Sequence, residues 1–190
     1  MRKVILLEHM SLDGFLAGPK GEMDWIRVED DGLWEEVSAF TDRSDTAIYG
    51  RVTYELMEAY WPTAAERPGA TRHDIDHSRW ANAATKLVFS RSLKEVAWEG
   101  SQLVRGDVAT SMAEIKARPG KDLLMLGSPS LARDFLALGL IDELWLSVNP
   151  VILGAGIPLF DERMVRSNFR LLKSRQFSTG VVGLHYEAGN

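Results

Sequence analysis

Apolar runs alternate along the chain with segments whose apolar side chains recur at helical spacing. Residues 4–7 read Val-Ile-Leu-Leu, a continuous run typical of a strand buried on both faces of a parallel sheet. Between residues 31 and 42, four large apolar side chains recur at helical spacing and predict a helix. The same reasoning predicts further strands over residues 46–49, 86–90, 102–105, 122–126 and 144–148, and further helices over residues 51–59, 108–118 and 129–138.

Turn residues separate these elements and predict where several of them begin. Asp107 and Ser128 are the expected N-caps of the two later helices. The polar segment 61–76 contains two prolines and a glycine and predicts a long loop. Residues 169–178 and 181–187 predict two strands joined by a turn around Thr179 and Gly180, so a terminal hairpin is expected. Strands that alternate with helices predict a single α/β domain over residues 1–190, built on a mostly parallel sheet with an antiparallel edge.

Composition narrows the class of protein. The chain has 190 residues, 45% of them hydrophobic, and a formal net charge of −5. A mildly acidic chain argues against a nucleic-acid partner, because phosphate contacts need a basic face. The absence of cysteine excludes disulfides, thiolate metal sites and cysteine nucleophiles, and it fits a cytoplasmic protein. No apolar run approaches the roughly 20 residues that span a bilayer, so no membrane partner is expected.

Candidate chemistry gathers where predicted strands end, because ligands of such sheets bind beyond the carboxyl ends of the strands. The strand over residues 46–49 runs into Gly50, Arg51 and Thr53 at the start of a helix. A glycine lets the backbone approach a ligand, a guanidinium matches the geometry of a phosphate, and the helix N-terminus adds free N–H groups. The alternative interpretation is a turn glycine followed by an exposed arginine.

At three further junctions, a predicted strand is also followed by residues that could bind a ligand. The strand over residues 86–90 ends in Ser90 and is followed by Arg91; solvated strand termini are the alternative. A glycine precedes a well-capped helix in the segment Gly127, Ser128, Pro129, Ser130, Leu131, where free N–H groups favour pyrophosphate binding. This segment is neither a P-loop nor a G-x-G-x-x-G fingerprint, and an ordinary βα turn is the alternative. Residues 151–160 contain two glycines and predict an irregular loop that lines the pocket or a dimer interface.

The four histidines are weaker candidates. His73 and His77 have the i, i+4 spacing of a zinc pair, but no third ligand is evident and their segment is polar, so a solvated surface is favoured and no metal site is expected. His9 and His185 lie in apolar strands. They are interpreted as hydrogen-bonded residues of the core or a cleft rather than as catalysts.

Taken together, six segments in order resemble the dihydrofolate reductase-like superfamily over nearly the whole chain. The closest resemblance is to the bacterial branch that shares the reductase domain of the riboflavin-biosynthesis deaminase/reductase, the RibD C-terminal domain. The segments are Ser11-Leu12-Asp13-Gly14-Phe15-Leu16-Ala17, Tyr49-Gly50-Arg51-Val52-Thr53-Tyr54, Val88-Phe89-Ser90-Arg91, Gly127-Ser128-Pro129-Ser130-Leu131, Gly139-Leu140-Ile141-Asp142-Glu143-Leu144 and Pro150-Val151-Ile152-Leu153-Gly154-Ala155-Gly156.

The resemblance implies a three-layer αβα sandwich, NADPH as hydride donor and a homodimer. It assigns Gly50, Arg51 and Thr53 to the cofactor, with Arg51 near the adenosine 2′-phosphate. It places Ser90 and Arg91 at the same adenosine end, and Gly127, Ser128, Ser130 and Leu131 at the pyrophosphate and the nicotinamide side. Ala17 and the loop after it would cover the nicotinamide. The apolar segment Leu144-Trp145-Leu146 is a second reason to expect a homodimer, because it needs covering.

The chain also departs from the family pattern. An acidic residue five positions after a loop tryptophan binds the pterin in dihydrofolate reductases, and counting from Trp25 nominates Asp30 as the proton donor. Gly127-Ser128 stands where the family has Gly-Gly, and the deaminase half of the riboflavin enzyme is absent. The predicted function is an NADPH-dependent reductase of a small pyrimidine- or pteridine-like substrate, similar to 5-amino-6-(5-phosphoribosylamino)uracil reductase and dihydrofolate reductase. The alternative is a non-catalytic NADP(H)-binding module that kept the fold.

Overall fold

A twisted eight-stranded sheet runs through the molecule, and the first strand of the chain lies in its interior. The computed structural model describes residues 1–189. The strand order is β5-β4-β3-β6-β1-β7-β10-β9; the first six strands are parallel, whereas β10 pairs antiparallel with both of its neighbours, β7 and β9. Their bounds are β1 Val4–Ser11, β3 Ser44–Gly50, β4 Thr85–Phe89, β5 Ser101–Val104, β6 Asp122–Leu126, β7 Glu143–Asn149, β9 Phe169–Gln176 and β10 Val182–Ala188.

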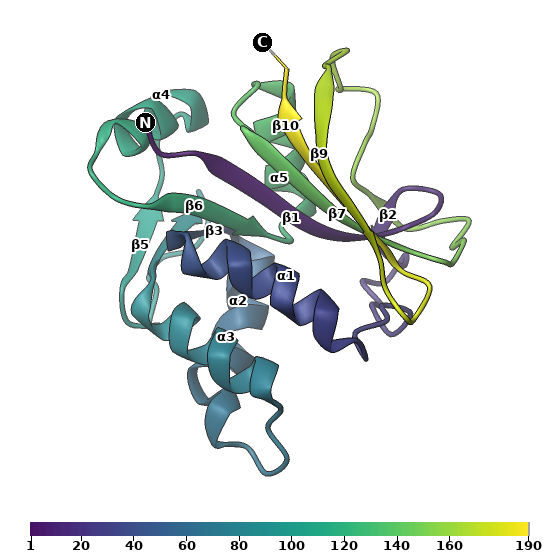
Figure 1. Cartoon of the computed structure of the whole chain (residues 1–190). Helices are drawn as coiled ribbons and strands as arrows, with labels where there is room; N and C mark the ends of the chain where they lie inside the picture. Colours follow the sequence, from purple (N-terminus) through teal and green to yellow (C-terminus); the bar gives the residue numbers. More distant parts are fainter. Residues whose placement is uncertain (190) are drawn as a thin grey trace.

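Helices cover both faces of this sheet (Figure 1). On one face lie α1 Asp31–Asp42, α2 Arg51–Tyr60 and α3 Arg72–Ala83, and on the other lie α4 Val108–Ala117 and α5 Pro129–Ala137. Each face has its own apolar core, because successive residues of a buried strand point to opposite sides: Leu6 belongs to the α4/α5 core and Leu7 to the core under α1–α3. The predicted αβα sandwich with a mostly parallel sheet and a terminal hairpin is therefore confirmed.

Two local predictions are corrected. The expected long loop over residues 61–76 instead forms a 3-10 helix, Trp61–Glu66, and the first part of α3. Thr71 and Asp74 make a capping box that starts α3, and its inner face packs on the core through Ser78 and Ala81. The second correction concerns the expected irregular loop over residues 151–160: it contains the short strand β8 Ile157–Pro158, which pairs antiparallel with β2 Phe15–Ala17.

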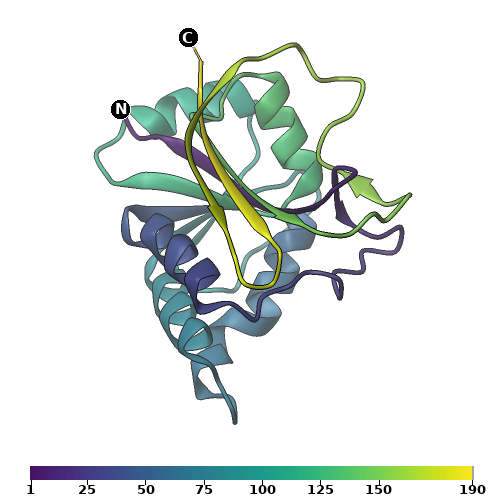
Figure 2. The same ribbon diagram turned by 45° about the vertical axis from the view of Figure 1, so that its right-hand side comes forward.

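The hairpin of β9 and β10 completes the sheet beside β7. Trp145 on β7 is only 2% exposed, since it packs under the hairpin residue Phe177 and beside Phe40 of α1. The expectation that Leu144-Trp145-Leu146 needs a second copy to cover it is thus wrong: the chain covers this strand by itself. Figure 2 shows the hairpin tip beside the segment that leads into α1, where Arg27 donates to the carbonyl of Thr179.

An ionic cluster around the buried Glu143 ties the amino ends of the strands together. Glu143 of β7 accepts hydrogen bonds from Lys3 before β1 and from Arg43 after α1, and it lies 3.0 Å from His185 of β10. Burial alone would raise the pKa of Glu143, but its hydrogen bonds with His185, Arg43 and Lys3 hold this pKa far below its usual range. The cluster therefore supports the end of the sheet opposite to the predicted site. Among the described residues, no helix combines the length and apolar character needed to cross a membrane.

Candidate functional site

Two helices begin side by side at the carboxyl ends of the neighbouring strands β3 and β6. α2 starts after Gly50, and α5 starts after Ser128. Neither helix has a side-chain cap, whereas Asp30, Thr71 and Asp107 cap the other three α-helices of the described chain. The first-turn N–H groups of α2 and α5 are thus free of side-chain caps, and with the helix dipole they form an anion-binding edge.

Ser128 joins these two helix starts. Its hydroxyl oxygen accepts from the backbone N–H of Gly50 at 2.9 Å, and its own N–H donates to the hydroxyl of Thr53 at 3.0 Å. Ser128 was predicted as the N-cap of α5; the position is confirmed, but its hydroxyl bonds the neighbouring helix start instead of its own helix. Its backbone is left-handed, with φ of 66°, and follows Gly127 at 62°, which explains why a second glycine suits this position.

The two helix starts lie close together at Gly50. A Cβ added to Gly50 would lie 3.7 Å from the Cβ atoms of Ser128 and Leu131, so it would fill the gap between the helices without clashing with protein. Backbone N–H groups and a glycine that permits close approach are the chemistry that dinucleotide sites use. Gly50, Thr53, Gly127, Ser128 and Leu131 are therefore brought together as predicted.

The predicted cationic residues lie at the same edge but farther out. Gly50 pairs with Phe89, so Arg51 and Ser90 leave neighbouring strands at the same level. Arg51 is exposed and pairs with Glu55 at 2.9 Å, one helical turn away. The Ser90 hydroxyl accepts from the backbone N–H of Leu93 and shapes the loop that carries the exposed Arg91. Ser130 is also exposed, on the first turn of α5.

The segment around β2, which ends at Ala17, is fixed by contacts that the sequence did not reveal. The carboxylate of Asp13 accepts from the Ser11 hydroxyl and from the backbone N–H groups of Leu153 and Gly154, at 2.7–3.1 Å. A Cβ on Gly156 would lie 2.1 Å from the carbonyl oxygen of Ala17, so only glycine fits there. The predicted irregular loop over residues 151–160 thus clamps the segment that carries Ala17.

Asp30, the predicted proton donor, lies at the start of α1 beside the hairpin tip. It is the N-cap of α1 and accepts from Gly32, and its second oxygen accepts from the backbone N–H and the hydroxyl of Ser178 at the hairpin tip. The hydroxyl and backbone N–H of Ser178 lower the pKa of Asp30. A general acid near neutral pH needs burial and a raised pKa, and the structure provides neither for this carboxyl group.

Several buried polar groups near the strand ends were not among the predicted site residues. Glu8 of β1 is buried with one carboxylate oxygen unpaired, and burial raises its pKa well above the usual range. Next to it, Nδ1 of His9 has no partner, and burial lowers the pKa of His9 to about 4. The hydroxyl of Tyr49, one residue before Gly50, is also buried and unpaired. A glutamate inside an apolar strand was the available sequence signal, because buried carboxyl groups are rare without a functional or paired environment.

The His73–His77 pair lies on α3 rather than on a solvated loop. The His73 ring stacks on Trp34 of α1 with a centroid separation of 3.5 Å, and His77 is only 7% exposed. The expectation of a solvated surface is therefore wrong for His77. No group of three or more metal-ligating side chains gathers among the described residues.

Comparison with known proteins places this geometry in a family. The sequence model of the RibD C-terminal domain matches residues 2–183. The chain is 35% identical over 187 residues to the uncharacterized protein YyaP of Bacillus subtilis, covering 97% of this chain and 94% of that protein.

Two solved structures show the same fold at low sequence identity. One is a deaminase and 5-amino-6-(5-phosphoribosylamino)uracil reductase from Thermotoga maritima, with 16% identity and a TM-score of 0.68 over 99% of this chain and 57% of that one. The other is the dihydrofolate reductase of Enterococcus faecalis complexed with NADP(H), with 13% identity and a TM-score of 0.60 over 99% and 97%. These two structures establish the shared fold.

Proposed function

Because the chain belongs to the RibD C-terminal domain family, we propose that it is an NADPH-dependent oxidoreductase that reduces a small pyrimidine- or pteridine-like substrate. The observation that carries the proposal is the pair of uncapped helix starts at Gly50 and Ser128, joined by the Ser128 hydroxyl. This edge suits the pyrophosphate of a dinucleotide. The Enterococcus dihydrofolate reductase, which has the same fold, was complexed with NADP(H).

Different residues around this edge would bind different parts of the cofactor. The N–H groups that begin α2 and α5 would bind the pyrophosphate, and Arg51 and Arg91 would bind the adenosine 2′-phosphate. Arg51 would exchange its exposed partner Glu55 for the phosphate, a small loss because exposed helix pairs contribute only about 0.3–0.5 kcal/mol. The clamp between Asp13 and Gly154 would hold Ala17 over the nicotinamide ring.

NADPH, when bound, supplies the hydride, and the protein aligns and shields the reacting atoms. The segment of Ala17, held against Gly156, would exclude water from one side of the ring. The substrate would approach on the face of the sheet that α1 covers. The Thermotoga relative in fold is named as a reductase of a substituted uracil, which supports a pyrimidine-like substrate.

Cofactor binding and turnover test the proposal separately. Calorimetry should give a dissociation constant for NADPH roughly tenfold to a hundredfold lower than for NADH, because a charge-assisted arginine–phosphate contact contributes about 1.5–3 kcal/mol. Arg51→Gln should remove most of this preference, and Arg118→Gln, an exposed arginine after α4, serves as the matched control. Equal affinity for the two cofactors would contradict the proposal. Loss of absorbance at 340 nm with substituted uracils and pterins should identify the substrate.

A second candidate function follows from Asp30. Its carboxylate is occupied by Gly32 and Ser178, so the proton donor of dihydrofolate reductases has no counterpart there. This favours a module that binds NADP(H) without catalysis. Tight NADPH binding together with no NADPH oxidation across the whole panel would select this second function over the first.

A further inference from the structure

The central sheet opens between β1 and β6 toward its carboxyl end. Leu7 is the last residue of β1 that pairs with β6, opposite Leu126, and β6 then gives way to the left-handed turn of Gly127 and Ser128. β1 continues to Ser11, and beyond Leu7 its strand partner in the described chain is β7 alone. We call this opening, between residues 8–11 and residues 127–128, the notch. It adjoins the start of α5, which belongs to the proposed cofactor edge.

Glu8 is the first residue of β1 at the notch, and its carboxyl group is not satisfied by the protein. Its side chain points to the face of the sheet covered by α4 and α5, because Leu6 and Met10, two residues before and after it, pack in the core of that face. The residue is only 4% exposed, and its Oε1 is buried without a hydrogen bond. A buried carboxyl oxygen without a partner is costly, so a polar ligand group in the notch would be stabilised by it.

The segment that ends at Ala17 lies on the same side of the sheet as Glu8. β2 packs against β1, and Leu16, the residue before Ala17, belongs with Leu131 of α5 to the core of this face. Glu8 thus shares its face with both elements that the proposed function assigns to the cofactor on this side. These elements are the Ala17 segment, at the nicotinamide, and the start of α5, at the pyrophosphate.

The charged groups of the elements packed around Glu8 are occupied elsewhere. β2 contains no ionisable side chain. The others are paired as follows: Glu143 of β7 and Asp122 of β6 with Arg43 at the amino ends of the strands, Arg133 and Asp134 of α5 with Asp161 and Arg163, and Lys116 of α4 with Asp142. Burial alone therefore acts on Glu8 and raises its pKa well above the usual range, which favours the uncharged acid.

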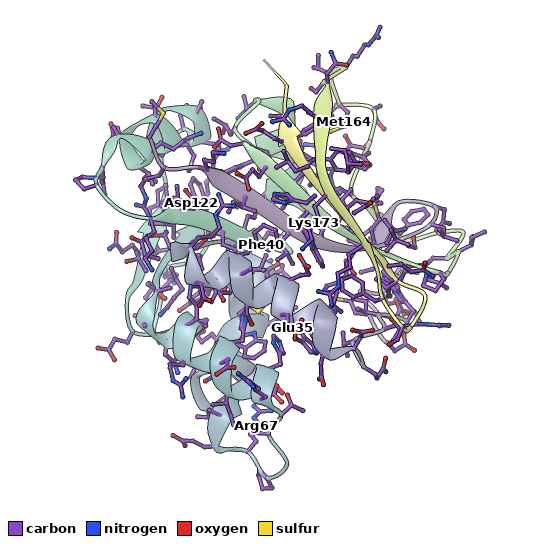
Figure 3. The ribbon with its side chains drawn as sticks, in the orientation of Figure 1. Glu35, Phe40, Arg67, Asp122, Met164 and Lys173 are labelled. Atoms are coloured by element: carbon purple, nitrogen blue, oxygen red, sulfur yellow. The ribbon has the colours of Figure 1, made fainter. Side chains whose placement is uncertain are left out.

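His9, the next residue, is also titratable but lies on the other face of the sheet. There its ring meets Trp145 edge-on, under the cover of α1 and its residue Phe40 (Figure 3). Burial lowers the pKa of His9 to about 4, so the ring stays uncharged near neutral pH. Glu8 is therefore the group of the notch whose charge can respond to a ligand in this range.

We propose that Glu8 contacts the nicotinamide end of the cofactor and distinguishes its two oxidation states, remaining uncharged beside NADPH and becoming ionised beside the positively charged ring of NADP+. The inference rests on the proposed function, because it takes the helix starts and the Ala17 segment as the cofactor site. A positive charge close to a buried carboxyl group stabilises its ionised form, more strongly in a protein interior than in water. Binding of NADP+ therefore releases the proton of Glu8 to the solvent, whereas binding of NADPH does not.

Calorimetry of the whole protein with NADP+ and with NADPH measures both affinities and the protons released. In two buffers of different ionisation enthalpy at pH 7, the wild type should release roughly half a proton or more with NADP+ beyond the value for NADPH. The ratio of NADP+ affinity to NADPH affinity should rise roughly tenfold from pH 6 to pH 8, because only NADP+ favours ionised Glu8. The 2′-phosphate titrates in both cofactors and cancels in this ratio.

Glu8→Gln keeps the size of the side chain and its capacity for hydrogen bonds but cannot ionise. It should release no additional proton with NADP+, and its affinity ratio should stay constant within about twofold over the same pH range. Glu114→Gln removes an exposed carboxylate of α4, on the same face of the sheet, and should behave as the wild type. A purely structural role of Glu8 would instead lower both affinities alike in the variant and leave the proton count unchanged.

An affinity ratio that does not depend on pH in the wild type, or that keeps its pH dependence in Glu8→Gln, would overturn the inference. Cofactor binding itself would then leave the proposed function standing. No binding of either cofactor would remove both. Because the proton count is measured on the wild type, the inference remains testable even if Glu8→Gln does not fold.

Discussion

The single side chain of Asp13 fixes the position of the segment that would lie over the nicotinamide ring. Its carboxylate bonds two backbone N–H groups of the segment that presses on Ala17. We expect Asp13→Ala to weaken NADPH binding about tenfold, because hydrogen bonds to a charged group are among the stronger ones and their loss frees the segment. Calorimetry measures this. Asp24→Ala, an exposed aspartate of the next loop, is the control; the same affinity in both variants would show that the clamp does not serve the cofactor.

Asp30 gives a prediction about pH. Hydrogen bonds from Ser178 lower its pKa in the folded protein, so the carboxylate stabilises the fold above its unfolded pKa of roughly 3.9, and this contribution disappears as the pH falls. The melting temperature of Asp30→Asn should therefore fall below that of the wild type at pH 7 and approach it near pH 3. Calorimetric melting at both pH values measures the difference. A large loss of turnover with an unchanged melting temperature would restore the proton-donor role.

At the scale of elements, the contact between α2 and α5 depends on one serine. Ser128→Ala leaves the half-buried N–H of Gly50 without its partner and should lower the free energy of unfolding by roughly 0.5–1.5 kcal/mol. Ser128→Gly loses the same bond but relieves a left-handed backbone, so it should cost roughly 1 kcal/mol less. Urea unfolding of the two variants gives the comparison. If Ser128→Gly is the less stable variant, relief of left-handed backbone strain does not determine the difference in stability between the two variants.

Elements with local signals could be predicted from the sequence, and elements that depend on distant partners could not. The helix over residues 31–42 is present as α1, since its apolar face and its cap Asp30 are adjacent in sequence. α3 escaped prediction because its buried face consists of His77, Ser78 and Ala81, which give no apolar period. The pairing of β2 with β8 also escaped prediction, because it joins segments about 140 residues apart.

In the candidate site, too, features with a local sequence signal could be predicted and contacts between distant segments could not. Gly50 and Gly127 could be predicted because a glycine between a strand and a helix is a local signal. The bond from Ser128 to Gly50, the clamp from Asp13 to Gly154 and the stack of Trp34 on His73 are contacts between distant segments. No pattern within a single element reveals them, and they decide which polar groups are free to meet a ligand.

The whole sheet depends on the ionic cluster around Glu143. Glu143→Gln removes the carboxylate that Lys3 and Arg43 share, although Lys3 keeps Glu187 and Arg43 keeps Asp122. Because both cations are partly exposed, the free energy of unfolding should fall by roughly 1–3 kcal/mol. Since the pKa of Glu143 is lowered in the folded state, wild-type stability should fall as the pH drops below roughly 4.3. The variant should lose less over this range. Urea unfolding at several pH values checks both statements, with the exposed Glu95→Gln as control; parallel pH curves for wild type and Glu143→Gln would contradict them.

We also propose that the chain forms a homodimer, although β7 needs no covering. The edge strand β9 instead exposes Leu171 and Leu172, at 50% and 41%. Light scattering at micromolar concentration should give twice the mass of the chain, and Leu172→Glu should shift it toward the monomer if β9 forms the interface. A monomeric mass for the wild type would exclude the dimer.

The position of β1 has a consequence for synthesis. This strand is synthesised long before its two partners, is apolar on both faces, and pairs with β6 and β7, so that Val4 meets Leu123 and Ile5 meets Glu143. At a translation rate of about 5–20 residues per second, it waits roughly 6–24 seconds for its first partner. During that interval the nascent chain carries an unpaired, hydrophobic strand that invites aggregation or chaperone capture. Slow codons between β1 and β6 should therefore lower the soluble yield more than the same codons placed after β7.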